Sequence, residues 1–123
     1  MFNYYIYRTY FNAKHSFNGD ITKIHGHSFT VVTYIGMKDS KEDIPFFKLE
    51  AIISSFIDQY RGRYLNELPE FEGCGNTLET IGDYFYEKLR KQLMKSGMEL
   101  YQLDISENPL CVYQVSDRML LPT

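Results

Sequence analysis

Hydrophobic and polar positions follow two different periods along the chain, and these periods predict where strands and helices lie. Residues 2–12 and 24–36 are rich in aromatic and β-branched side chains, which favours strands. Residues 45–60 place apolar side chains three and four positions apart, the spacing of an amphipathic helix. The same spacing predicts a second helix that begins at 76–77 and ends near 96–97. Two further strands are predicted over the ranges 98–106 and 110–116, joined by a turn at 107–109.

The predicted order of elements is ββααββ, which indicates the α+β class. A four-stranded antiparallel sheet with two helices on one face follows from that order. Neither repeats nor low-complexity linkers interrupt it, so we expect residues 1–123 to form a single domain. Residues 61–75 are predicted to form a long irregular connection, and loops of that length are often functional.

Composition and charge narrow the classes of function. The formal net charge of −3 gives no indication of a basic surface that would bind nucleic acid. Because no apolar run approaches 18 residues, we expect no membrane-spanning helix. The two cysteines, Cys74 and Cys111, are too few for a disulfide framework. We therefore expect a cytoplasmic, reducing location. Cys111 falls in the middle of a predicted strand, and we expect it to be buried in the core.

The histidines carry the most specific chemical signal in the sequence. His15, His25 and His27 are the only histidines of the chain. In a strand, residues two apart point to the same side, so His25 and His27 would lie next to each other. His15 can join them if the first two strands pair antiparallel. Three neutral imidazoles with an open fourth position are typical of a catalytic zinc site, whereas two unrelated surface histidines are the simpler alternative.

Further motifs follow these histidines in a fixed order along nearly the whole chain. The motifs are Phe11-Asn12-Ala13-Lys14-His15, His25-Gly26-His27-Ser28-Phe29, Ile57-Asp58-Gln59 with Leu65-Asn66, Asn76-Thr77-Leu78-Glu79, and Ile105-Ser106-Glu107-Asn108. In this order and at this spacing the sequence resembles the 6-pyruvoyl-tetrahydropterin synthase and 6-carboxytetrahydropterin synthase family. The resemblance implies the tunnelling fold. It also implies a homo-oligomer, a hexamer built as a dimer of trimers, in which subunits join their sheets into a barrel.

The resemblance also implies a cofactor, a substrate and residues that hold them. Zn2+ would be bound by His15, His25 and His27, and the small-molecule substrate would be a pterin. Glu107 would bind the pterin through paired hydrogen bonds. The alternative is that Glu107 is simply a polar residue of the predicted turn. Thr77 and Glu79 match family residues near the pterin pocket, and a helix cap explains both equally well.

The catalytic groups are where this sequence departs from the family pattern. The family has a cysteine shortly before the second zinc motif, whereas residues 16–24 contain none. Of the family's aspartate-histidine pair, the aspartate is matched by Asp58, but Gln59 replaces the histidine and cannot shuttle protons. Asp20 is a candidate replacement base, although Asn-Gly-Asp is also a common turn sequence. Cys74 could supply a thiol from a neighbouring subunit, but a small buried residue is the simpler interpretation.

Three hypotheses for the function are therefore open. The first is a zinc-dependent lyase that converts 7,8-dihydroneopterin triphosphate to 6-carboxytetrahydropterin or a related tetrahydropterin, as in queuosine and pterin biosynthesis. The second is a zinc- and pterin-binding protein with impaired catalysis. The third is an altered lyase that cleaves the dihydroneopterin side chain by retro-aldol chemistry.

Overall fold

A computed structural model of the protein describes residues 3–15, 25–39, 42–71, 77–108 and 110–117, with the backbone alone for His15 and His25. The elements follow the order ββααββ, as predicted from the sequence. The strands are β1 (Tyr5–His15), β2 (His25–Met37), β3 (Met98–Asn108) and β4 (Cys111–Val115). The helices are α1 (Phe46–Asp58) and α2 (Leu78–Met94), and none of the described helices is long and apolar enough to cross a membrane.

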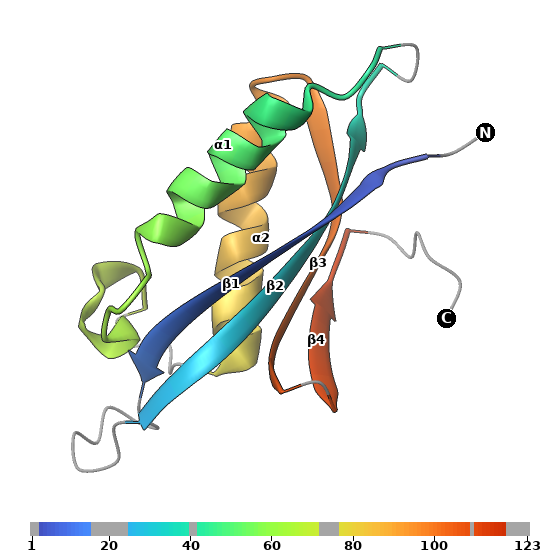
Figure 1. Ribbon diagram of the computed structural model, residues 1–123. Coiled ribbons are helices and arrows are strands. Elements are labelled where there is room, and N and C mark those ends of the chain that lie inside the picture. Colours follow the sequence, from blue (N-terminus) through green and yellow to red (C-terminus); the bar gives the residue numbers. More distant parts are fainter. Residues whose placement is uncertain (1–2, 16–24, 40–41, 72–76, 109, 118–123) are drawn as a thin grey trace.

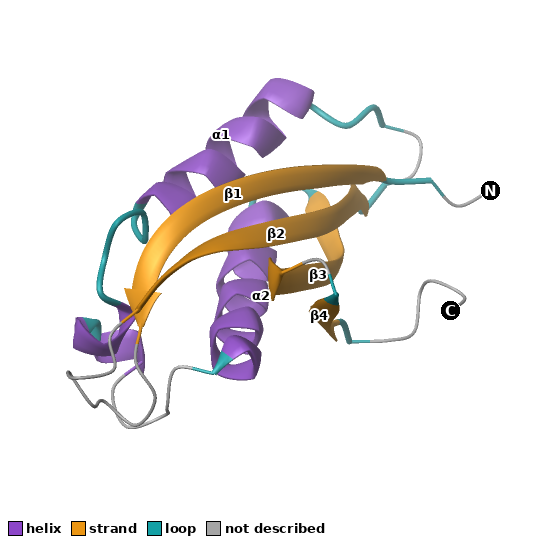
Figure 2. Cartoon of the chain, turned by 60° about the horizontal axis from the view of Figure 1, so that its bottom comes forward, coloured by secondary structure: helices purple, strands orange, loops and turns teal. Residues whose placement is uncertain are grey.

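The sheet is antiparallel throughout, and its strands lie in the order β1-β2-β3-β4. Both long helices lie between β2 and β3 in the sequence and cover the same face of the sheet (Figure 1). The predicted four-stranded sheet with two helices on one face is therefore confirmed. In this arrangement β1 and β4 are the edge strands, and none of the described helices covers the opposite face of the sheet (Figure 2).

Aromatic side chains join the helices to the sheet in the core. Phe85 of α2 is fully buried and its ring lies 5.8 Å from the ring of Phe11, 5.1 Å from that of Phe56 and 4.8 Å from that of Tyr60. Aromatic pairs at such distances stabilise a core beyond the area that they bury. Close packing of this kind holds α1, α2 and β1 in fixed positions.

A buried polar group lies on the helix-free face of the sheet. Asp104 is 6% exposed, and its carboxylate accepts hydrogen bonds from the Tyr34 hydroxyl at 2.7 Å and from Nε2 of Gln102 at 2.8 Å. Burial of the Tyr34 hydroxyl and its hydrogen bond to Asp104 raise the pKa of Tyr34 to about 12. These two hydrogen bonds satisfy the buried carboxylate.

The structure differs from the sequence prediction at several boundaries. β3 continues to Asn108, so Glu107 lies in a strand and not in the predicted turn. The longer strand is possible because the turn itself is tight, with Asn108 paired to Cys111 and Oδ1 of Asn108 accepting a hydrogen bond from the Leu110 amide at 2.9 Å. Cys111 is exposed at the start of β4, so its predicted place in the core was wrong. The connection after α1 contains 3-10 helices at Leu65–Glu67 and Pro69–Phe71, where an irregular path was predicted.

Candidate functional site

The three histidine positions lie together at one end of the β1–β2 pair. His15 is directly opposite His25 in the antiparallel register, and Ala13 is directly opposite His27. Successive residues of a strand alternate between the two faces. Because buried Phe11 and Phe29 occupy the same alternation, the three histidine positions belong to the helix-covered face. The backbone thus brings together the three residues that were predicted as metal ligands.

His27 is the one predicted metal ligand whose side chain is described. Its Nε2 atom is buried and lies 3.6 Å from Oε2 of Glu107, which β3 brings to the same end of the sheet. The side chains of His27 and Glu107 are 31% and 25% exposed. The ring of His27 also meets the edge of the Phe29 ring at 6.3 Å. An imidazole and a carboxylate from different strands therefore meet where both remain accessible.

A hollow of about 320 Å³ lies against this end of the β1–β2 pair. The residues that line it are Asn12, Ala13, Lys14, Gly26, His27, Ser28 and Gly62. The Ser28 hydroxyl donates a hydrogen bond of 2.6 Å to Oδ1 of Asn12, which fixes two polar side chains at its surface. A Cβ added at Gly26 would meet no atom within 4 Å, so the space over this glycine is open, on the face opposite to the histidine positions.

Residues 60–64, which we call the edge segment, run along the outer edge of β1 beside the hollow. The Gly62 amide donates to the carbonyl of Asn12 at 2.6 Å, and the Lys14 amide donates to the carbonyl of Arg63 at 2.9 Å. Gly62 has a φ of 70°, in the left-handed region where glycine carries no steric penalty. Sequence reasoning missed this contribution of Gly62. A glycine between two arginines is a turn signal, but it does not reveal which strand the segment will join.

The remaining predicted site residues lie in different places. Asp58 ends α1, where its Oδ1 atom accepts a hydrogen bond of 2.7 Å from Nε of Arg61, and it is absent from the lining of the hollow. Thr77 is the N-cap of α2, with its hydroxyl oxygen accepting from the Thr80 amide at 3.2 Å. Glu79 is exposed in the first turn of that helix. Asp20, predicted as a base, lies outside the described residues.

Comparison with known proteins identifies the family. A family model described as 6-pyruvoyl tetrahydropterin synthase matches residues 5–118, nearly the whole chain. The chain belongs to the 6-pyruvoyl tetrahydropterin synthase family. None of the curated protein sequences matches it closely enough to add to this result.

Solved structures of this synthase family share the fold. The 6-pyruvoyl tetrahydropterin synthase of Caenorhabditis elegans matches with a TM-score of 0.78 at 20% identity, over 94% of this chain and 96% of its own. The synthase of Plasmodium falciparum matches with a TM-score of 0.68 at 17% identity, over 95% and 98% of the two chains. A catalytic-residue mutant of the Plasmodium vivax synthase, in which a glutamate is replaced by alanine, matches with a TM-score of 0.62 at 15% identity, over 94% and 99%. These matches confirm the tunnelling fold, and membership of the family places the chain among the lyases of tetrahydropterin biosynthesis at the family level.

The synthase family generally uses zinc, and the residues at this end of the sheet fit that ion. Imidazole nitrogen is a preferred zinc ligand, and Ala13 opposite His27 leaves room on the ligand face. Where side chains are described, no group of three or more His, Cys, Asp or Glu side chains is placed to hold a metal ion. The side chains of His15 and His25 are outside that part. The fit to zinc therefore rests on the backbone register and on His27.

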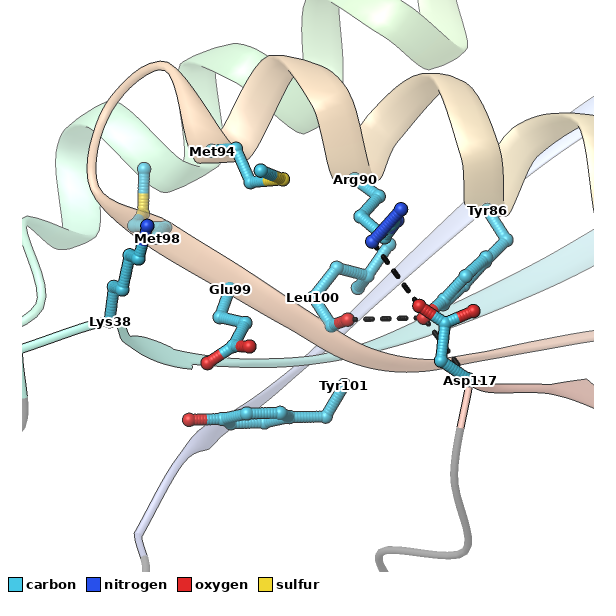
Figure 3. A pocket seen from close by; sticks show the side chains of 9 residues that line it. All are labelled: Lys38, Tyr86, Arg90, Met94, Met98, Glu99, Leu100, Tyr101 and Asp117. Atoms are coloured by element: carbon cyan, nitrogen blue, oxygen red, sulfur yellow. Dashed lines mark hydrogen bonds and ion pairs between the residues drawn. The ribbon is translucent and has the colours of Figure 1, made fainter.

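A second cavity, of about 180 Å³, is lined by residues from the start of β3, among them Met98 and Glu99 (Figure 3). His27 lies near the other end of that strand, beside Glu107. Asp117, which follows β4, also lines it. There Oδ2 of Asp117 lies 3.2 Å from Nη1 of Arg90, and the Asp117 amide donates to the Tyr86 hydroxyl at 3.3 Å. The Tyr86 hydroxyl in turn donates to the Leu100 carbonyl at 3.5 Å, and its burial raises the pKa of Tyr86. These contacts tie the end of the described chain to α2.

Proposed function

We propose that this protein is a zinc-dependent lyase that acts on 7,8-dihydroneopterin triphosphate and forms 6-carboxytetrahydropterin or a related tetrahydropterin. The observation that carries the proposal is the register of β1 and β2, which brings all three histidines of the chain to one end of one face. Membership of the 6-pyruvoyl tetrahydropterin synthase family supplies the substrate class. We further propose a homo-oligomer, a hexamer of two trimers, as the assembled form.

Each residue of the site has a role in this proposal. His15, His25 and His27 would hold the zinc ion, which would supply Lewis-acid polarisation of the substrate's side-chain oxygens when bound. Glu107 would accept two hydrogen bonds from the amino group and ring N–H of the pterin, a paired geometry that suits a carboxylate. Its position beside His27, at 3.6 Å, would place the pterin ring next to the metal ligands.

A carboxylate is the proposed proton-transfer group. With no cysteine in residues 16–24, Asp20 is the acidic candidate of that segment. A catalytic glutamate in the Plasmodium vivax relative supports a carboxylate as base in this fold. That observation favours the altered lyase, which cleaves the side chain by retro-aldol chemistry, as the second candidate. A catalytically impaired protein that binds zinc and pterin is the third.

Turnover of the zinc-loaded protein tests these candidates. We would incubate it with 7,8-dihydroneopterin triphosphate, with and without a chelator, and identify pterin products by mass spectrometry. A chelator-sensitive product is expected, and its mass separates triphosphate elimination from side-chain cleavage. Asp20→Asn should abolish turnover if Asp20 is the base, and unchanged turnover would remove Asp20 from the mechanism. No product together with tight pterin binding would favour the impaired protein.

A further inference from the structure

Arg61 ties the edge segment to two other elements. Its Nε atom donates to Oδ1 of Asp58, at the end of α1, at 2.7 Å. Its Nη1 atom donates to the carbonyl of Tyr10, in β1, at 2.5 Å. One guanidinium therefore links the end of a helix to the outer edge of the sheet, across 51 positions in the sequence. Charged hydrogen bonds to a main-chain carbonyl fix the path of the chain as well as the side chain.

The residue that follows this link lines the hollow. Gly62 is bound through its amide to the carbonyl of Asn12, and the next carbonyl, of Arg63, accepts from Lys14. Asn12, Lys14 and Gly62 all line the hollow next to His27. Gly62 has no side chain, so its backbone forms the wall of the hollow at this point, and a Cβ added there would meet no atom within 4 Å. The position of the wall consequently depends on the hydrogen bonds that hold the edge segment.

We propose that Asp58 and Arg61 are a positioning pair that sets this wall of the hollow, and that Asp58 takes no part in proton transfer. The inference rests on the proposed function only in taking the hollow, which His27 lines, as part of the pterin site beside Glu107. A general base must reach its proton directly or through one water. The Asp58 side chain is 61% exposed, is bound to Arg61, and does not line the hollow. This position allows Asp58 to orient the Arg61 guanidinium through their hydrogen bond.

The competing explanation is an ordinary surface ion pair that has no effect on the hollow. Exposed ion pairs contribute little to stability, and the two side chains here are 46% and 61% exposed. Two features distinguish the Asp58–Arg61 pair from an ordinary surface ion pair. Arg61 also binds the main chain of β1, and the next residue is a left-handed glycine whose amide is bound to β1. A loss of Arg61 should therefore loosen the edge segment locally and leave the global stability nearly unchanged.

The chain offers a matched control at the other end of the sheet. Arg90 and Asp117 form an ion pair of 3.2 Å with side chains that are 35% and 59% exposed, similar to those of Asp58 and Arg61. We would compare Arg61→Ala, Arg61→Lys and Asp58→Asn with Arg90→Ala. The measurements are amide hydrogen exchange at Gly62 and Lys14, the dissociation constant of neopterin from its fluorescence, and KM, kcat and their pH profiles where turnover is found.

Arg61→Ala should speed exchange at Gly62 and Lys14 by about tenfold or more, because local opening becomes easier. It should weaken neopterin binding and raise KM roughly fivefold. The value of kcat should stay within about twofold and its pH profile should keep its shape, because the change displaces the Gly62 wall of the hollow and leaves the proton-transfer group in place. Asp58→Asn should act in the same direction more weakly, Arg61→Lys should restore part of the loss, and Arg90→Ala should change none of these quantities.

Two results would overturn the inference. The first is unchanged exchange at Gly62 and Lys14 in Arg61→Ala, which would show that the pair does not hold the edge segment. The second is a loss of about a hundredfold in kcat with an altered pH profile in Asp58→Asn, the signature of a general base. If the wild-type protein shows no turnover, the proposed function fails, and the exchange and neopterin measurements still decide the role of the pair.

Discussion

Glu107→Gln isolates the role of the carboxylate beside His27. The substitution keeps the size of the side chain and removes its charge, so a pterin loses the paired acceptor that we propose for its amino group and ring N–H. Hydrogen bonds to a charged group contribute about 1.5–3 kcal/mol. At about 1.4 kcal/mol per tenfold change, this loss corresponds to roughly 10- to 150-fold weaker pterin binding.

The same substitution should hardly affect folding. His27 and Glu107 are 3.6 Å apart and both are partly exposed, so their interaction contributes at most about 1 kcal/mol to stability. We would measure neopterin affinity by fluorescence titration and the free energy of unfolding by urea denaturation. Glu99→Gln, on the same strand at its opposite end, is the matched control and should leave both unchanged. Equal neopterin affinity in Glu107→Gln and the wild type would refute the assignment of Glu107 as the pterin anchor.

Three further predictions concern the scaffold that holds the site. Phe85→Ala should lower the free energy of unfolding by about 3–5 kcal/mol in urea denaturation, since the ring is fully buried, and a loss below about 1 kcal/mol would contradict the packing described. Gly82→Ala should destabilise by up to about 2 kcal/mol in the same assay, because an overpacking cost of about 1–3 kcal/mol exceeds the gain of roughly 1 kcal/mol in helix propensity. The added Cβ would lie 2.9 Å from Cγ2 of Ile105. A variant more stable than the wild type would contradict the prediction and show that the Ile105 side chain moves aside at little cost. Stability should fall as pH rises from about 10 to about 12, because Tyr34 ionises first in the unfolded chain and only later beside Asp104. Tyr34→Phe should flatten that fall, and an equally steep profile would remove Tyr34 as a cause.

Local patterns in the sequence account for most of the fold. The apolar spacing predicted both helices, and β-branched and aromatic runs predicted the strands, because these patterns reflect which face of an element is buried. The boundaries were less accurate. The first strand was predicted to end at residue 12, but it continues to His15 because its partner begins at His25, and pairing between strands is not visible in either segment alone.

The site was predictable where the ligands lie in one strand or its neighbour. The alternation of β2 placed His25 and His27 on one side, and an antiparallel partner added His15. The wall formed by Gly62 was not predictable, since it arises from hydrogen bonds between an irregular segment and a strand edge about 50 residues earlier. Glu107 was assigned to a turn because Asn108 and Pro109 favour one, whereas pairing with β4 extends the strand.

Zinc content tests the central claim of this account most directly. All three histidines of the chain are proposed ligands, so no other imidazole can substitute for them. We would load the apo-protein with zinc, remove the excess, and measure bound zinc per chain for the wild type and for His15→Ala, His25→Ala and His27→Ala, with circular dichroism to confirm folding. The account predicts one zinc ion per wild-type chain and a large loss of affinity in every variant. A folded wild-type protein that binds no zinc, or folded variants that bind it as tightly as the wild type does, would contradict it.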